Sequence, residues 1–171
     1  MDAVKELKHK GKTIEIYADE NPTSPRENDN LGTILYLKGS RYILGDKAMT
    51  REEIDAIVVF KDVVVLPVYA YIHSGIAMNT TGFSCPWDSG QSGVIYAERS
   101  KILENFRAKR LTPALRAKVE KILQGEVEEY SKYLGGEVYG FIVKDANGEE
   151  VDSCWGFIGL EYAIEAAKEA C

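Results

Sequence analysis

One short turn signal does most to limit what this chain can fold into: Asn147-Gly148, within the stretch EVYGFIVKDANGEEVDSCWGFIG. Asparagine and glycine tolerate the positive φ angles that tight hairpin turns require, and strand-forming residues flank the pair on both sides. We therefore expect two antiparallel strands here. A second hairpin is expected in residues 31–45, with its turn near Lys38, Gly39 and Ser40.

Helical segments lie between the expected strands. Thr50 has Glu53 three residues later, a capping box that predicts a short helix. The pair Thr112-Pro113 begins a longer helix, in which apolar residues recur at helical spacing until Gly135-Gly136 ends it. Further helices are expected from Ser100, as the cap, to about Arg107, and over residues 162–170.

Strands are expected where β-branched and aromatic residues are dense, namely Thr13–Tyr17, Val63–Tyr71 and Gly93–Ala97. Pro67 cannot donate a ladder hydrogen bond, so it implies a bulge or an unpaired edge. Residues 18–30 contain two prolines and many polar residues, which predicts a loop. Because the hairpins pair their strands antiparallel, the expected fold class is α+β: a mainly antiparallel sheet of about five strands with helices packed on it. A chain of 171 residues favours a single domain spanning residues 1–171.

The glycine-rich stretch IHSGIAMNTTGFSCPWDSGQSGVIYA, residues 72–97, concentrates polar and reactive side chains. The candidates for binding a ligand or partner are His73, Ser74, Asn79, Trp87, Asp88, Ser89, Gln91 and, from a second motif, Trp155. Within the stretch, DSGQSG could cradle an anion with its backbone N–H groups, but it lacks the lysine of a P-loop. A turn that joins two strands needs no ligand and is the favoured interpretation.

Three residues of the stretch also form a catalytic alternative. Cys85, His73 and Asp88 are the ingredients of a thiol nucleophile, its base and an orienting acid. The spacing matches no hydrolase signature, and a buried cysteine packed beside Trp87 explains Cys85 equally well. We therefore expect no catalytic residues, with a small cysteine-dependent hydrolase or transferase as the alternative.

The cysteines argue against a disulfide scaffold and against a metal site. Cys85, Cys154 and Cys171 are odd in number and contain no CxxC pair, whereas structural zinc sites carry closely spaced ligand pairs. A set that adds His73 and Asp88 is equally scattered. We expect no metal, no cofactor and reduced thiols.

Two tryptophan motifs share their residue types. CPWDSG (residues 85–90) and DSCWG (residues 152–156) each adjoin an expected strand. We expect both to lie at one end or face of the sheet, where two large indoles could pack or form the wall of a pocket. If that pocket binds a ligand, His73 should face the same cavity as Asp88 and Gln91.

Composition narrows the classes of partner. The formal net charge of −6 argues against direct nucleic-acid binding, which needs a positive surface, and fits either solubility alone or docking onto a basic partner. Ten tyrosines suit sheet faces and binding surfaces. The sequence has neither a secretory signal nor an apolar run of membrane-spanning length, so we expect no membrane contact and a cytoplasmic location.

Several segments resemble a family of small proteins, encoded by bacteriophages and other bacterial mobile elements, to which no enzyme function is assigned. They are DNLGT (29–33), LGD (44–46), LPVYAYIHSGIAMNTTGFSCPWDSGQSGVIY (66–96), EVEEYSKYLGGEVYGF (126–141) and DSCWGFIG (152–159). The resemblance covers most of the chain beyond about Asp29. It implies a phage accessory protein in the cytoplasm of a bacterial host, and such proteins often act against host defences. The expected function is a non-enzymatic binder, anti-CRISPR-like or otherwise anti-defence, that sequesters a bacterial host defence protein or its signalling molecule.

Overall fold

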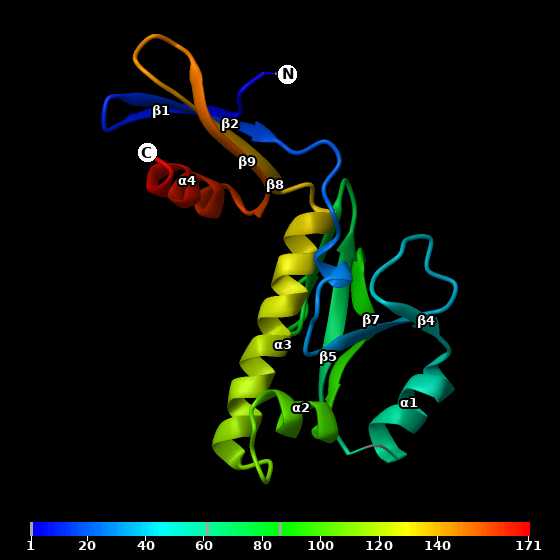
Figure 1. Ribbon diagram of the computed structural model, residues 1–171. Coiled ribbons are helices and arrows are strands. Elements are labelled where there is room, and N and C mark those ends of the chain that lie inside the picture. Colours follow the sequence, from blue (N-terminus) through cyan, green and yellow to red (C-terminus); the bar gives the residue numbers. More distant parts are fainter. Residues whose placement is uncertain (1, 61, 86) are drawn as a thin grey trace. The chain divides into compact units, whose positions relative to one another are not determined.

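The computed structural model describes residues 2–60, 62–85 and 87–171, which form two compact units. The four-stranded unit comprises Met1–Ser24 and Lys132–Cys171, and the five-stranded unit comprises Pro25–Ser131 (Figure 1). The elements in chain order are β1 (Lys5–His9), β2 (Lys12–Ala18), the 3₁₀ turn η1 (Pro25–Glu27), β3 (Thr33–Leu37), β4 (Lys47–Met49), α1 (Arg51–Phe60), β5 (Val63–Ile72), β6 (Ile76–Asn79), β7 (Ser89–Glu98), α2 (Arg99–Asn105), α3 (Pro113–Leu134), β8 (Val138–Lys144), β9 (Glu150–Ile158) and α4 (Leu160–Glu169).

The fold class is α+β, as predicted, but the strands form two sheets rather than one of about five strands. The smaller sheet has the order β1-β2-β8-β9 and the larger has the order β4-β3-β7-β5-β6. Strands β1 and β6 were not expected from the sequence. Each of the two units has its own sheet and hydrophobic core. The single domain expected from the length of the chain stays a prediction.

The predicted hairpin at Asn147-Gly148 is confirmed as the β8–β9 pair. Gly148 has a φ of +87°, the left-handed conformation that favours glycine. The carboxylate of Asp145 accepts hydrogen bonds from the N–H groups of Glu149 at 3.0 Å and Asn147 at 2.8 Å. These donors hold the pKa of Asp145 below its ordinary value. The turn is thus stabilised locally, which is why the sequence alone indicates it.

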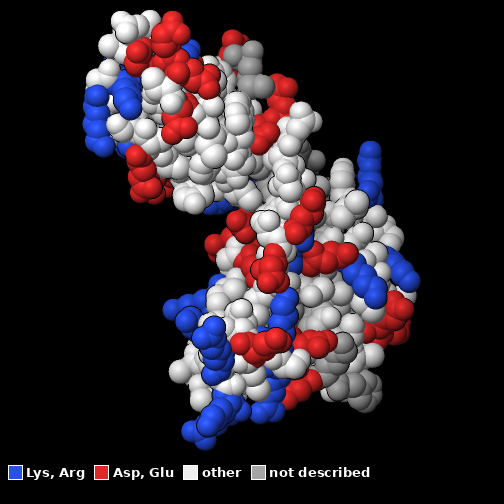
Figure 2. Space-filling view, in the orientation of Figure 1, with Lys and Arg blue, Asp and Glu red and all other residues white. Residues whose placement is uncertain are grey.

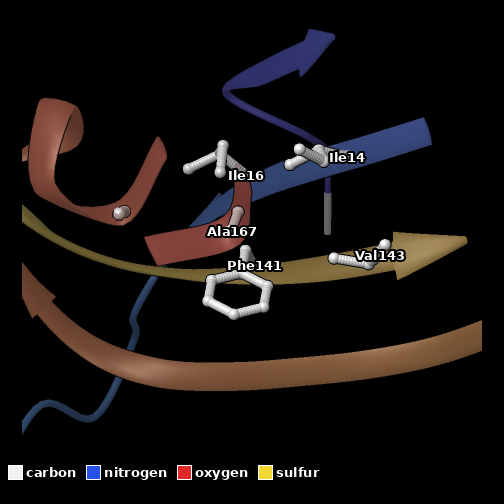
Figure 3. Close-up of a cluster of buried hydrophobic side chains, with 6 residues drawn as sticks. Ile14, Ile16, Phe141, Val143 and Ala167 are labelled. Carbon is white, nitrogen blue, oxygen red and sulfur yellow. The ribbon is translucent and has the colours of Figure 1, made fainter. Parts of the chain in front are cut away.

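The core of the four-stranded unit lies between its sheet and α4. Alternate residues of a strand point to the same face, and here that face is apolar and meets two small residues of the helix. Figure 3 shows side chains of this cluster from β2, β8 and α4 gathered in one place. Its buried members are Ile14, Ile16, Phe141, Val143, Ala163 and Ala167.

The larger sheet is antiparallel except for one pair. β3 and β4 run parallel, with Leu35 opposite Lys47, so the expected hairpin over residues 31–45 is wrong. The chain does turn after β3, but Gly45 then packs against Ile34, and the N–H of Asp46 donates to the carbonyl of Ile34 at 2.8 Å. Because these contacts return the chain to the start of β3, β4 begins there and runs in the same direction.

Helices cover both faces of the larger sheet. Adjacent residues in a strand point to opposite faces. In β7, Val94 packs in one cluster with Ile54 of α1. The next residue, Ile95, and Leu123 of α3 both crowd the space beside Gly32. The helix predicted after Thr112 therefore packs on one face, and α1 covers the other (Figure 1).

The helix caps agree with the sequence in two of three cases. Thr50 and Glu53 form the predicted capping box, with reciprocal hydrogen bonds of 2.8 and 3.2 Å. The hydroxyl of Thr112 accepts from the N–H of Leu115 at 3.2 Å. The predicted cap at Ser100 is wrong, because α2 starts one residue earlier and has no side-chain cap.

One strand start differs from expectation. β7 begins at Ser89 and not at Gly93, so most of the run DSGQSG is strand. The expectation for Pro67 is confirmed: β6 pairs with β5 only from Tyr69 to Ile72, so Pro67 has a strand neighbour on one side alone, in β7. A register shift also falls close to it, between Val68 and Tyr69.

A buried guanidinium joins the segments of the five-stranded unit. The side chain of Arg26 is only 8% exposed. Its Nε and Nη2 donate to both carboxylate oxygens of Asp46 at 2.9 and 2.7 Å, and its Nη1 donates to Glu126 at 3.1 Å. Nη2 also donates to the carbonyl of Gly32 at 2.7 Å. Burial by itself would lower the pKa of Arg26, but the bonds to Asp46 and Glu126 outweigh it and raise that pKa.

The carboxylates of Asp46 and Glu126 also accept hydrogen bonds from backbone N–H groups. Glu126 Oε1 accepts from the N–H of Leu31 at 2.8 Å and from that of Gly32 at 3.2 Å. Asp46 Oδ2 accepts from the N–H of Ile34 at 2.7 Å. Arg26, Asp46 and Glu126, called the Arg26 cluster below, therefore connect η1, the start of β3, the start of β4 and α3.

We predict that Arg26→Met destabilises the protein by about 3 kcal/mol, because it leaves the largely buried carboxylate of Glu126 and the partly exposed one of Asp46 without their cation. Arg26→Lys should recover only part of this loss, since an ammonium keeps the charge but cannot form the two-pronged contact with Asp46. The measurement is the free energy of unfolding in urea.

Arg99→Met is the matched control, because Arg99 also forms an ion pair, 2.9 Å from Asp62, but an exposed one. Its loss should cost no more than about 1 kcal/mol. Equal destabilisation by Arg26→Met and Arg99→Met would contradict the role assigned to the Arg26 cluster.

Candidate functional site

Seven of the eight candidate site residues come from the β5–β6–β7 region of the larger sheet. His73 and Ser74 lie in the turn after β5, and Asn79 ends β6. The other four, Trp87, Asp88, Ser89 and Gln91, lie just before β7 or at its start. Tyr71 pairs with Ser89, and the N–H of Ile72 donates to the carbonyl of Asp88 at 3.0 Å. The end of β5 and the start of β7 are therefore side by side.

His73 is positioned by a tight turn that the sequence did not indicate. Ile72 pairs with Ile76, and the N–H of His73 donates to the carbonyl of Gly75 at 3.2 Å. The imidazole is 65% exposed, and its Nδ1 lies 3.6 Å from Oδ2 of Asp88. Ser74 is exposed in the same turn.

Asn79 has a structural task. Its Oδ1 accepts from the N–H groups of Gly82 at 2.7 Å and Thr81 at 3.2 Å, and its Nδ2 donates to the carbonyl of Gly82 at 3.0 Å. Gly82 has a φ of +88°. The amide thus holds the turn after β6 and has few hydrogen-bonding positions left for a ligand.

The three residues of the catalytic alternative approach one another in an order that does not suit a thiol nucleophile. Asp88 lies between the other two, with its Oδ2 4.0 Å from Sγ of Cys85 and 3.6 Å from Nδ1 of His73. No contact joins Cys85 to His73 in the part of the chain that is described. A base must reach the nucleophile directly or through one water to take its proton. Here the immediate neighbour of the thiol is a carboxylate.

Trp87 is the most exposed large apolar side chain recorded in the described chain, at 92%. It borders a shallow cavity of about 340 Å³, together with Lys38, Leu44, Asp88, Ser89 and Gln91. His73 is not among the lining residues and reaches this place only through Asp88. The side chains of Ser89 and Gln91 already form hydrogen bonds within the protein. Ser89 Oγ donates to the carbonyl of Cys85, and Gln91 Nε2 donates to the carbonyl of Gly93.

A second exposed segment borders the same cavity, and the sequence analysis missed it. The β3–β4 loop contributes Lys38, Ser40 and Leu44 to the lining and exposes Tyr42 by 37% and Ile43 by 70%. The hydroxyl of Tyr130 donates to the carbonyl of Ile43 at 3.2 Å, which anchors the loop to α3. Adjacent apolar residues in a turn could have indicated this surface, but the hairpin interpretation hid it.

The run DSGQSG is part of a strand pair rather than an anion-binding loop. Gly90 pairs with Ala70, Gln91 with Tyr69, and Gly93 with Val68. Gly93 has its own reason to be glycine: a Cβ there would lie 1.9 Å from the carbonyl oxygen of Leu35. Close approach of β3 and β7 explains it without any ligand.

Trp155 belongs to the other unit. It lies on β9 in the four-stranded sheet, whereas CPWDSG adjoins the five-stranded sheet, so the expectation that both motifs share one sheet is wrong. The ring of Trp155 packs over Gly140, and its centre lies 6.2 Å from that of the Tyr17 ring. These contacts cover part of the side chain and leave 44% of it exposed. Beside them, hydrogen bonds from Lys144 and Tyr17 lower the pKa of Glu15.

The remaining observations concern cysteines, metals and membranes. Cys85, Cys154 and Cys171 are free thiols. Within residues 2–60, 62–85 and 87–171, no three His, Cys, Asp or Glu side chains converge as a metal ion would require. None of the helices in the described part combines the length and apolarity needed to cross a bilayer.

Comparisons with known proteins do not assign the chain. No family model matches it, and no curated protein or solved structure matches it significantly. The candidate site is therefore argued from its own geometry.

We predict that Gly93→Ala destabilises the protein by about 1–3 kcal/mol, because the added methyl group would force β3 and β7 apart. Gly90→Ala in the same strand is the matched control, since nothing lies within 4 Å of a Cβ at that position. The control should change stability by less than about 0.5 kcal/mol. Thermal melting of both variants distinguishes a packing requirement from a general need for glycine in this run.

Proposed function

We propose that this protein is a non-enzymatic binder of a bacteriophage or other mobile element, and that it counters a bacterial defence system by sequestering one of its proteins. The binding site would be the Trp87 surface, defined as Trp87, Tyr42, Ile43 and the cavity between their loops. The observation that carries the proposal is the 92% exposure of Trp87 beside this cavity. The phage context rests on the resemblance described above.

An exposed indole is suited to anchor a protein partner. Tryptophan is enriched among the few interface residues that supply most of the binding energy, and removing such a residue costs about 2 kcal/mol or more. A second apolar contribution comes from Ile43, which is 70% exposed in the other loop at the cavity. Leu44, the neighbour of Ile43, lines the shallow depression together with Trp87, and a protruding side chain of a partner can fill a depression of this kind.

The polar groups around these anchors suit the rim of an interface. Lys38, Asp88 and Gln91 line the cavity, and Asp88 also lies 3.6 Å from His73. Polar residues surround the apolar centre of a typical interface and add directional hydrogen bonds. The cavity, about 340 Å³, lies at the small end of the range for small-molecule sites, and it is shallow. These features favour a host defence protein over its signalling molecule as the partner.

The order of the polar groups also favours binding over catalysis. A cysteine-dependent enzyme needs its imidazole against the thiol, and here Asp88 stands between Cys85 and His73. A structural role accounts for these three residues, since the contacts of Asp88 with Cys85 and His73 link the β5–β6 turn to the segment before β7.

The test is a phage infection assay in a bacterial strain that carries one defined defence system, repeated for restriction and CRISPR systems. Expression of the protein should raise the efficiency of plaque formation in at least one strain. Trp87→Ala should reduce this protection at least tenfold, because a loss of about 2 kcal/mol weakens binding roughly 30-fold. Its melting temperature should stay within about 2 °C of the unchanged protein, since exposed side chains contribute little to stability.

Two control variants make the assay decisive. Val59→Ser removes another strongly exposed apolar side chain, 71% exposed on α1, and should leave protection unchanged. Cys85→Ser should also leave it unchanged. Loss of protection in Cys85→Ser with full protection in Trp87→Ala would instead support the enzyme alternative.

A further inference from the structure

The charge of the chain is strongly segregated. Residues 107–121, called the basic segment here, join α2 to α3 and include the first turns of α3. They contain six Lys and Arg side chains and one carboxylate, Glu120, so their net charge is +5 in a chain whose total is −6. The six cations are Arg107, Lys109, Arg110, Arg116, Lys118 and Lys121, and all six are exposed.

These cations are not used within the fold. None of the ion pairs found in the described part of the chain involves the basic segment, although Arg99 and Lys101 just before it are both paired. Among the six cationic side chains, the contact recorded within the described residues is that of Lys118, whose ammonium lies 5.0 Å from the ring centre of Phe106. Because this contact holds the first turns of α3 against the end of α2, it brings Arg107 into the same surface. Figure 2 shows Lys and Arg side chains gathered over α2 and the first half of α3.

Arg107 occupies a position that its own backbone does not favour. Its φ is +49°, in the left-handed region, directly after the last turn of α2. Glycine is the usual residue at such a helix end, because a side chain is strained there. An arginine at this position supplies a charge at the expense of stability, which points to a use for that charge outside the fold.

The absence of strongly exposed large apolar side chains from the basic segment indicates which class of partner it can bind. None of the strongly exposed large apolar side chains in the described chain falls within residues 107–121. A protein interface needs such anchors, and single-stranded nucleic acid needs exposed aromatic rings on which its bases stack. Recognition of RNA duplexes relies on contacts to 2′-hydroxyls across the minor groove as well as to phosphates. The only uncharged polar side chain in the segment is Thr112, whose hydroxyl caps α3 by accepting from the N–H of Leu115.

We propose that the basic segment binds the phosphate backbone of double-stranded DNA. Arginine and lysine contacts to phosphates need neither apolar anchors nor base readout, and the N-terminal end of α3 adds partial positive charge to the same surface. Net charge argued against such binding only because the excess of carboxylates elsewhere conceals this segment in the sum. The proposal is independent of the Trp87 surface.

The experiment measures binding of the full chain to a 30-base-pair DNA duplex by fluorescence anisotropy between 50 and 200 mM salt. Six phosphate contacts predict that affinity falls about 1,000-fold over this range. The variant Lys109→Glu/Arg110→Glu/Lys121→Glu should abolish measurable binding. The variant Lys5→Glu/Lys8→Glu/Lys168→Glu makes the same change in net charge at exposed positions of the four-stranded unit, and it should retain at least a third of the affinity.

Arg107→Gly separates binding from folding. It should raise the melting temperature by about 2–4 °C, because it relieves the strained backbone, while it lowers the salt dependence by about one phosphate contact. This variant stays informative even if the triple reversal fails to fold.

Three outcomes would overturn the proposal. One is equal binding by the two triple variants. Another is tighter binding of single-stranded DNA or of an RNA duplex of the same sequence. The third is no DNA binding at 50 mM salt together with self-association that the segment variant removes, which would identify an acidic surface of a second copy as the partner.

Discussion

The five-stranded unit depends on one buried guanidinium. Arg26 comes from a 3₁₀ turn with no strand partner, yet it bonds carboxylates from two distant places, Asp46 before β4 and Glu126 in α3. Those carboxylates accept from the N–H groups of Leu31, Gly32 and Ile34, where β3 begins. Removing charges from water is costly, so such a cluster forms only when each partner is satisfied by the others. The Arg26 cluster therefore determines that β4 runs parallel to β3 and that α3 packs at its position on the sheet.

The same cluster includes residues of several segments on which the expected resemblance to phage-encoded proteins was based. DNLGT contains the N–H groups that Glu126 holds, LGD ends in Asp46, and EVEEY begins with Glu126. Three motifs that are far apart in the chain thus meet at one guanidinium. Leu31, Gly32, Asp46 and Glu126 thus have structural roles, and motifs that contain them need not indicate a function.

What could be predicted from the sequence is what short-range contacts determine. The turn at Asn147-Gly148, the capping box of α1 and the start of α3 each depend on residues within five positions of one another. The parallel pairing of β3 and β4 depends on Asp46 and Arg26, twenty residues apart, and no local pattern reports it. Strand β1 was missed because its lysines and glutamate resemble a solvated segment, although such charges are common on edge strands.

The candidate site shows the same limit. In the sequence, Asn79 and the run that contains Gly93 were candidates for binding a ligand. In the structure, Asn79 stabilises the turn after β6, and Gly93 allows the close approach of β3 and β7. Trp87 was a candidate in the sequence, but its exposure could not be read there, because exposure is a property of packing. The basic segment is visible in the sequence, but a net charge summed over the whole chain concealed it.

The two tryptophan motifs show most directly why residue types alone do not assign a role. Trp155 lies on a glycine, Gly140, which leaves room for the ring to cover the strand, and Tyr17 packs beside it. Trp87, in a motif of the same residue types, has no comparable cover and is 92% exposed. Water contact over an entire indole is unfavourable, and contact with a binding partner would relieve it. The five-stranded unit therefore presents two surfaces of different chemistry, an apolar anchor that suits a protein and a cationic segment without anchors that suits a polyanion.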